Sequence, residues 1–112
     1  MSLQKWSDDI WIKRLADRPA LSEDLEVVTE RYRAEMSPPH LMLDMSQVTA
    51  LGSANLSQMM ELHKHARVHG RRMKIASPGN AVWSVFMIAS LDGFFEFAED
   101  PAAGLADLQI GG

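Results

Sequence analysis

The chain has 112 residues, of which 46% are hydrophobic and 23% charged, a balance typical of one globular domain with a single core. Its formal net charge of -4 argues against a general nucleic-acid binder, and the lack of cysteine excludes disulfides and cysteine-based metal or redox sites. No apolar run is long enough to span a bilayer and no signal-peptide core follows the first residues, so we expect a cytoplasmic protein without membrane insertion.

The first predicted element is a strand over 8–17, where apolar and polar residues alternate to give two partly apolar faces. Pro19 ends it, because proline cannot donate to a strand ladder. A second short strand over 15–20 is a weak candidate. The ends of the chain, 1–7 and 110–112, are expected to be flexible.

The first predicted helix covers 21–36. Ser22 is a good N-cap, and acidic residues follow in the first turns, where the helix dipole favours them. Apolar residues recur at helical spacing, namely Leu25, Val28 and Tyr32. A Ser-Pro-Pro sequence at 37–39 then stops the helix.

The short apolar run from His40 to Met45 is typical of a central strand buried on both faces. Asp44 lies near its end. This carboxylate could be a catalytic acid, but a structural role is favoured, in which it hydrogen-bonds the loop that follows.

A small polar turn over 51–55 then leads into an amphipathic helix. In an open α/β sheet the carboxyl end of a strand meets the amino end of the next helix, where unpaired N–H groups carry partial positive charge. An anion or a phosphorylated side chain is stabilised there. Ser53 lies at this junction, and its hydroxyl could instead cap the helix.

The apolar face of this helix is predicted to lie in the core, and its members are Leu56, Met59, Met60, Leu62, His63 and Ala66. His65 and His69 stand one turn apart, as metal ligands can, but no third ligand is evident and no metal site is predicted.

Basic residues gather near the end of the same helix, namely Lys64, Arg67, Arg71, Arg72 and Lys74. They could complement the helix carboxyl end, where Gly70 can adopt a left-handed cap, or form a patch for phosphate or an acidic partner.

A strand over 73–76 and a helix beginning at Asn80, a fair N-cap, follow. The predicted buried stripe of this helix consists of Val82, Val85, Phe86 and Ala89, broadened by Ile88. Trp83 and Met87 lie four residues apart on another face. They either contact a partner or a second copy of the chain, or belong to the core.

A turn and a short final strand are expected over 91–97, where phenylalanines can close the core. Asp100-Pro101 is predicted to begin the last helix, since proline suits a first turn, with Leu105 and Leu108 facing inward.

The segment 43–56, LDMSQVTALGSANL, resembles the signature of the STAS domain, the sulphate-transporter and anti-sigma-factor-antagonist family. Asp44, Val48 and Leu56 match that signature. Ser53 falls on the serine that bacterial anti-anti-sigma factors have phosphorylated.

Three positions differ from the family pattern. Gly52 replaces an aspartate, Ala54 a serine and Asn55 a glycine. The missing carboxylate at position 52 removes a group that contributes to partner recognition in the family. Trp83 and Met87 fall on positions that are usually charged.

The resemblance implies an α/β fold, a single STAS-like domain over 8–109. Its mixed, mostly parallel sheet would have four to five strands, with about four helices packed mainly on one side. It also implies a non-enzymatic regulatory module, and the sequence has neither a Gly-x-Ser-x-Gly elbow nor a phosphate-binding glycine loop. No catalytic residue and no cofactor are predicted.

By this resemblance the protein would act as an anti-sigma factor antagonist. Its partner would be an anti-sigma factor serine kinase, with phosphorylation of Ser53 as the candidate switch and a phosphatase as a further candidate partner. The expected partner-binding residues are Gly52, Ser53, Ala54, Asn55, Ser57, Trp83 and Met87, the last two also serving a candidate homodimer. The alternative is a STAS subunit of a lipid-transport ATPase or of a stress-signalling assembly, without a phospho-switch.

Overall fold

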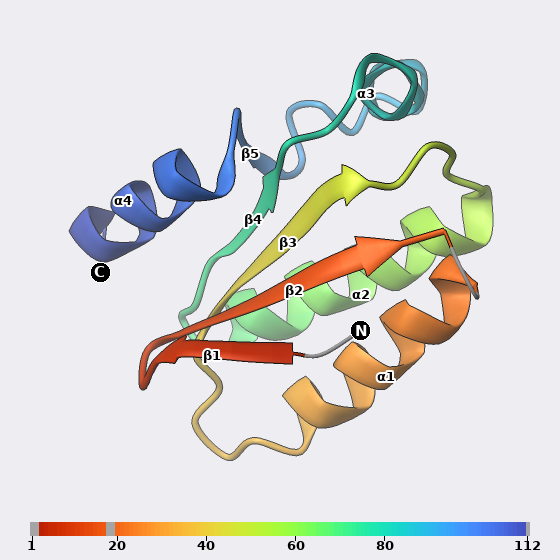
Figure 1. The fold of residues 1–112 in the computed structure, drawn as a ribbon. Helices are drawn as coiled ribbons and strands as arrows, with labels where there is room; N and C mark the ends of the chain where they lie inside the picture. The colour runs from red at the N-terminus through yellow and green to blue at the C-terminus, as the bar shows by residue number, and fades with distance from the viewer. Residues whose placement is uncertain (1–2, 18–19, 112) are drawn as a thin grey trace.

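The structure is a computed structural model that describes residues 3–17 and 20–111. Within these residues five strands and four helices follow one another along the chain (Figure 1). Their bounds are β1 (Leu3–Ser7), β2 (Ile10–Ala16), α1 (Leu21–Arg33), β3 (His40–Gln47), α2 (Ser53–Val68), β4 (Met73–Ala76), α3 (Asn80–Ile88), β5 (Glu96–Ala98) and α4 (Pro101–Gly111).

The five strands form one sheet in the order β1-β2-β3-β4-β5. β1 pairs antiparallel with β2, whereas each later neighbour pair is parallel. Parallel neighbours need a crossover, and here each crossover contains one helix, α1, α2 or α3. This is the mixed, mostly parallel sheet that the sequence predicts.

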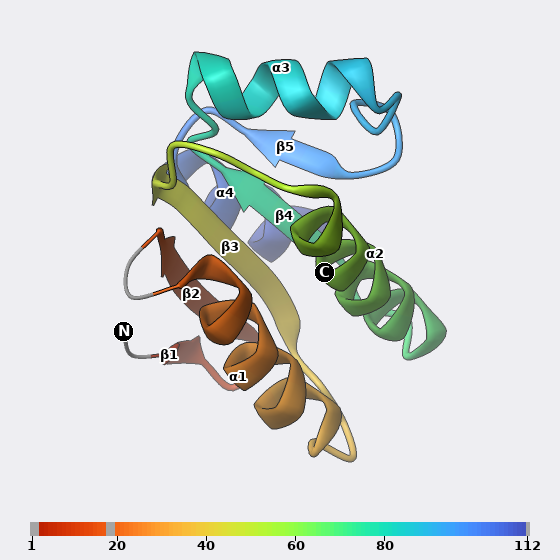
Figure 2. The same ribbon diagram turned by 90° about the vertical axis from the view of Figure 1, so that its right-hand side faces the viewer.

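β3 is the central strand, and its residues from His40 to Met45 are all buried. Side chains alternate between the two faces of a strand, so Leu41 and Leu43 join the large core cluster while Met42 joins a smaller one on the opposite face. Figure 2 shows α1 and α2 on one side of the sheet and α4 on the other. The predicted burial of this strand on both faces is confirmed.

α4 packs close to the sheet because position 104 is a glycine. A Cβ atom added there would lie 2.6 Å from the Met42 sulphur, well inside van der Waals contact. The predicted start of this helix is confirmed, since the Ala103 N–H donates to the Asp100 carboxylate (2.8 Å). Leu108 is buried on β3 and Leu105 packs beside it.

The N-terminal part of the sheet differs from the expectation. Leu3–Ser7 form β1, an edge strand, where the sequence suggests a flexible end; residues 1–2 lie outside the described part. The candidate strand over 15–20 is wrong, because its first two residues belong to β2, and 18–19 are outside the described residues. β1 lacks an apolar alternation because four of its five residues are exposed, and this absence hides it in the sequence.

Two predicted helix caps are also wrong. The N-caps of α1 and α3 are Ala20 and Gly79, and neither helix has a side-chain cap. Ser22 and Asn80 therefore lie inside the first turns. α1 also ends at Arg33, three residues before the predicted end.

Candidate partner-binding site at the start of α2

Ser53 is the first residue of α2, directly after the N-cap Gly52, on the chain that leaves the carboxyl end of β3. The first intrahelical hydrogen bond runs from the Leu56 N–H to the Gly52 carbonyl (3.1 Å). The N–H groups of residues 53–55 therefore have no acceptor within the helix. They carry the positive end of the helix dipole, and no acidic residue lies in the first turn to compensate it.

The Ser53 side chain is exposed, and its hydroxyl forms no hydrogen bond with any residue that the structure describes. The capping role that the sequence left open for it is not adopted, because Gly52 occupies the N-cap position. A group attached to this oxygen would lie in solvent next to unpaired backbone amides.

The Asn55 side chain fixes the turn rather than facing solvent. Its Oδ1 accepts from the Gly52 N–H (3.0 Å), and its Nδ2 donates to the Ser22 hydroxyl of α1 (2.9 Å). Gln58 adds a bond to the Ser22 carbonyl (3.1 Å). Of the residues predicted here to contact a partner, Gly52, Ser53, Ala54 and Ser57 are exposed, whereas Asn55 is half-buried and holds α2 against α1.

Two carboxylates lie at the start of the loop between β3 and α2. Asp44 accepts from the Ser46 N–H (2.9 Å), so its role is structural as predicted, but this bond is made within the end of β3 and not to the loop. Asp17 accepts from both the backbone N–H (3.0 Å) and the hydroxyl (2.5 Å) of Thr49. Asp17, directly after β2, thus fastens the start of the loop that presents Ser53, and we expect this loop to keep its shape when a partner binds.

Gly52 has no conformational reason to be glycine. Its φ is -102°, and a Cβ atom would lie 3.6 Å from Asn55 Oδ1, an ordinary contact. The family's aspartate would fit there and could accept from the free amides of the first turn.

We therefore expect Gly52→Asp to be more stable than Gly52→Ala by about 1 kcal/mol, the usual gain from a capping carboxylate over alanine. Urea unfolding of both variants measures the difference. The alanine variant is the matched control, since it brings the same loss of backbone freedom without a capping oxygen. Equal midpoints for the two variants would show that position 52 does not cap α2.

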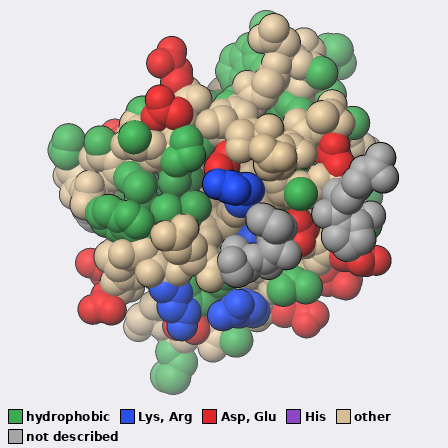
Figure 3. All heavy atoms as spheres, in the orientation of Figure 1, with side chains coloured by type: hydrophobic (Ala, Val, Ile, Leu, Met, Phe, Trp, Pro, Cys, Tyr) green, Lys and Arg blue, Asp and Glu red, His purple; other side chains and the backbone are tan. Residues whose placement is uncertain are grey.

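The outer side of α3 exposes apolar side chains, which Figure 3 shows at the top of the molecule. Met87 is 52% exposed and Ile88 85% exposed, so the prediction that Ile88 broadens the buried stripe is wrong. Only Val82 and Phe86 are buried, because this nine-residue helix contacts the core along one narrow side. Trp83 is half-buried, with its ring edge-on to Phe97 at 4.8 Å.

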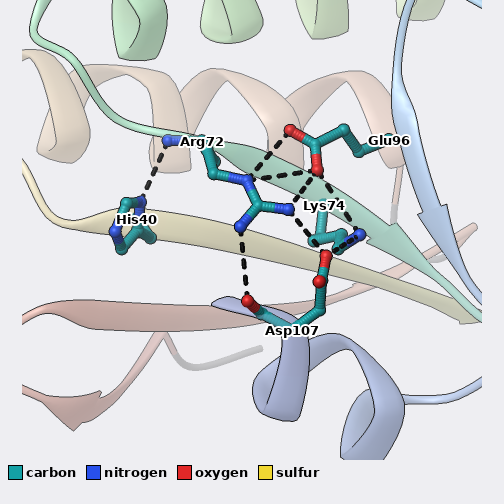
Figure 4. Close-up of polar contacts among 5 residues, drawn as sticks. All are labelled: His40, Arg72, Lys74, Glu96 and Asp107. Atoms are coloured by element: carbon teal, nitrogen blue, oxygen red, sulfur yellow. Dashed lines mark hydrogen bonds and ion pairs between the residues drawn. The ribbon is translucent and has the colours of Figure 1, made fainter. Parts of the chain in front are cut away.

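The predicted basic patch is divided by the fold. Arg72 and Lys74 lie on the α4 side of the sheet and pair with Glu96 of β5 and Asp107 of α4 (Figure 4). Hydrogen bonds from Arg72 hold the pKa of the Glu96 carboxyl below its usual range. Two of the five cations therefore join structural elements and are not available to a partner.

The other basic residues lie near the end of α2. Lys64 and Arg67 are exposed, and Arg71 is 3.8 Å from the Asp9 carboxylate. Gly70 adopts the expected left-handed conformation, with φ 70°. His65 and His69 are adjacent, and within the described ranges no group of three or more His, Asp or Glu side chains could hold a metal.

A family model described as "Mlab, STAS domain" matches residues 14–98. The chain belongs to the STAS domain family. The match includes the strand, loop and helix that present Ser53. None of the curated proteins compared with the chain matches it.

Solved structures share the STAS fold at low sequence identity. A serine-to-glutamate variant of RsbS from Moorella thermoacetica is 18% identical with a TM-score of 0.80, covering 97% of this chain and 94% of that one. A candidate anti-sigma factor antagonist from Thermotoga maritima is 15% identical with a TM-score of 0.73, covering 92% and 90%. A chain of the stressosome, described as a signal integration and transduction hub, is 18% identical with a TM-score of 0.75, covering 97% and 96%.

In the part of this STAS domain that the structure describes, no helix combines the length and the apolar character that a membrane span requires.

Proposed function

We propose that this STAS domain is a non-enzymatic regulatory module of the cytoplasm that binds a serine-kinase anti-sigma factor and releases it when Ser53 is phosphorylated. The exposed Ser53 hydroxyl at the amino end of α2, beside three amides without an intrahelical acceptor, carries the proposal. The fold shared with an RsbS variant and a candidate anti-sigma factor antagonist supports it.

The unmodified binding surface consists of the exposed loop residues Gly52, Ser53 and Ala54 together with Ser57 one turn further along α2. These are small side chains, so a partner can approach the backbone closely. A phosphate on Ser53 adds about 1.5 to 2 negative charges and three acceptor oxygens, which changes both the size and the charge of this surface. A phosphatase would restore the binding form.

We expect Ser53→Asp to weaken binding to the cognate anti-sigma kinase at least tenfold, about 1.4 kcal/mol or more, because a charge then stands at the centre of the contact. Isothermal titration calorimetry with the purified kinase measures this effect. Ser37→Asp is the control, since it puts the same charge on an exposed serine between α1 and β3, outside the proposed binding surface, and no loss is expected.

Incubation with the kinase and ATP, followed by mass spectrometry, tests the modification itself. Phosphate on Ser53 would support the switch. Without phosphate there, and with Ser53→Asp binding as tightly as the wild type, the switch is wrong. A pull-down that returns a transport ATPase or a stress-signalling complex in place of a kinase would favour the alternative role, a constitutive STAS subunit.

The apolar side of α3 is the proposed contact for a second copy of the chain, through Trp83 and Met87. Met87 is half-exposed on a helix with no charged side chain, which is unusual for a surface that faces only water. A twofold contact would bring the same side of α3 from each copy together.

We expect Met87→Glu to convert the dimer to a monomer, because two carboxylates would meet in an apolar contact. Sedimentation equilibrium measures the change and circular dichroism checks the fold. Val27→Glu is the matched control and should retain the dimer, because Val27 of α1 is also 52% exposed but lies outside the proposed contact. A wild-type protein that is monomeric at high concentration would contradict the proposed contact.

A further inference from the structure

A cavity of about 410 Å³ lies at the end of the sheet opposite Ser53. The β1–β2 turn, the amino ends of β2 and β3, the loop before β4 and the last turns of α4 enclose it. Its volume is within the range of small-molecule sites. None of its residues takes part in the proposed kinase contact.

His40 supplies a hydrogen-bond donor to this cavity. Its side chain is buried, with 3% of the residue exposed, and its Nδ1 accepts from the Arg72 N–H at 3.0 Å (Figure 4). Burial and the nearby cations Arg71 and Arg72 lower the pKa of the ring, so it is neutral near pH 7. A neutral ring whose Nδ1 accepts must carry its proton on Nε2.

The Nε2–H of His40 has no acceptor among the residues that the structure describes, although His40 lines the cavity. In the described part of the chain, His63 and His65 have ring nitrogens that are unpaired and inaccessible to solvent, but His40 Nε2 does not belong to this group. A ligand atom that accepts a hydrogen bond could therefore reach it. The fixed tautomer makes this position a donor and not an acceptor.

Arg71 supplies a cation to the same cavity. Its contact with Asp9 is long, at 3.8 Å, and the Asp9 side chain is 74% exposed. Such an exposed ion pair contributes little to the free energy of folding. An oxyanion can therefore replace Asp9 as the partner of Arg71 with little loss of stability. A guanidinium binds a carboxylate through two parallel hydrogen bonds, which favours this anion.

The remaining wall combines the polar residues Ser7 and Gln109 with an apolar part. Ile10 and Leu108 are buried in the smaller core cluster and line the cavity from β2 and α4. Trp6 lines it from β1 and is 41% exposed, a large fraction for an indole. In Figure 3 hydrophobic side chains gather on the same face of the molecule, over α4. A flat apolar ring that enters the cavity would remove the exposed Trp6 indole from water.

We propose that the cavity binds a small aromatic carboxylate, whose carboxylate accepts from His40 Nε2–H and Arg71 and whose ring packs against Trp6, Ile10 and Leu108. A monoanion fits better than a phosphate dianion, because one guanidinium is available and Asp9 stays nearby. A neutral aromatic compound would leave Arg71 without a new partner. The ligand site is independent of the Ser53 surface.

Benzoate is the probe, titrated into the full chain labelled with ¹⁵N, and the Trp6 indole N–H signal is followed by NMR. We expect a saturable shift of this signal. Benzamide, which keeps the ring without the charge, and acetate, which keeps the charge without the ring, should bind at least tenfold more weakly.

Arg71→Gln should lower benzoate affinity at least tenfold, since it removes a charge-assisted hydrogen bond. Arg67→Gln, an exposed arginine that does not line the cavity, is the matched control and should bind as the wild type does. A spectrum with unchanged dispersion shows that each variant is folded. The proposal is overturned if benzoate gives no saturable shift at Trp6, if benzamide binds equally well, or if Arg71→Gln has no effect.

Discussion

Replacing Phe86 with alanine is expected to lower the free energy of unfolding by about 3–5 kcal/mol, a large part of the total stability of a small domain. Phe86 is fully buried in the main core cluster. Its ring packs edge-on against Phe95, at 5.6 Å between centroids, and against Phe97, at 5.1 Å. Truncation leaves a cavity between α3 and β5 and removes both aromatic contacts.

Urea unfolding followed by circular dichroism measures this loss. Ile88→Ala is the neighbouring control, because Ile88 is 85% exposed and its truncation should change stability by less than about 0.5 kcal/mol. Similar losses for the two variants would mean that α3 does not pack against the core in the register described here.

Replacing Glu96 with glutamine is expected to lower stability by about 2 kcal/mol, because buried Lys74 loses one of its two anionic partners and Arg72 loses another. Lys74 is buried, with 7% of the residue exposed, and would retain only Asp107 as an anionic partner. Arg72 would lose its paired contact with the Glu96 carboxylate, including the bond from Nε at 3.1 Å. The effect is below that of a fully buried pair because the Glu96 side chain is 37% exposed.

The same substitution should alter the dependence of stability on pH. Hydrogen bonds from Arg72 lower the pKa of Glu96 in the folded state, while in the unfolded chain it is about 4.3. The contribution of Glu96 to the free energy of unfolding is therefore present at neutral pH. It is lost as the pH falls below about 4.3 and through the lower pKa of the folded state.

Unfolding of wild type and Glu96→Gln at pH 7 and at pH 3 measures this effect, and the two should differ less at pH 3. Glu99→Gln changes an exposed carboxylate just after β5 and is the control at both pH values. A stability difference that stays constant between pH 7 and pH 3 would contradict the role of the ion pair.

The spacing of apolar residues is sufficient to predict the elements that are strongly amphipathic or fully apolar. The central strand, the buried side of α2 and the inward face of α4 follow from residues such as Leu43, Met59 and Leu108. Each of these lies in a pattern that matches its own secondary structure, so local sequence and tertiary packing agree. β1 was missed for the opposite reason, since an edge strand needs no buried side chains to pair.

The position and exposure of Ser53 follow from the strand-turn-helix order together with the family signature. The role of Asn55 in joining α2 to α1 does not follow from the sequence, because its partner Ser22 is 33 residues away on another helix. The pairing of Arg72 with Glu96 and Asp107 is hidden for the same reason, as these residues come from the loop before β4, from β5 and from α4. The sequence shows which charged side chains are present, but only the fold determines which of them form ion pairs.

The serine and the cavity lie at opposite ends of β3, an eight-residue strand buried on both faces over most of its length. Eight residues of strand span about 26 Å, roughly three Debye lengths at physiological ionic strength. A phosphate on Ser53 is therefore too far away to change ligand affinity through its field. If the two ends do influence each other, the influence must be mechanical, through a displacement of the whole strand against the helices on its two sides.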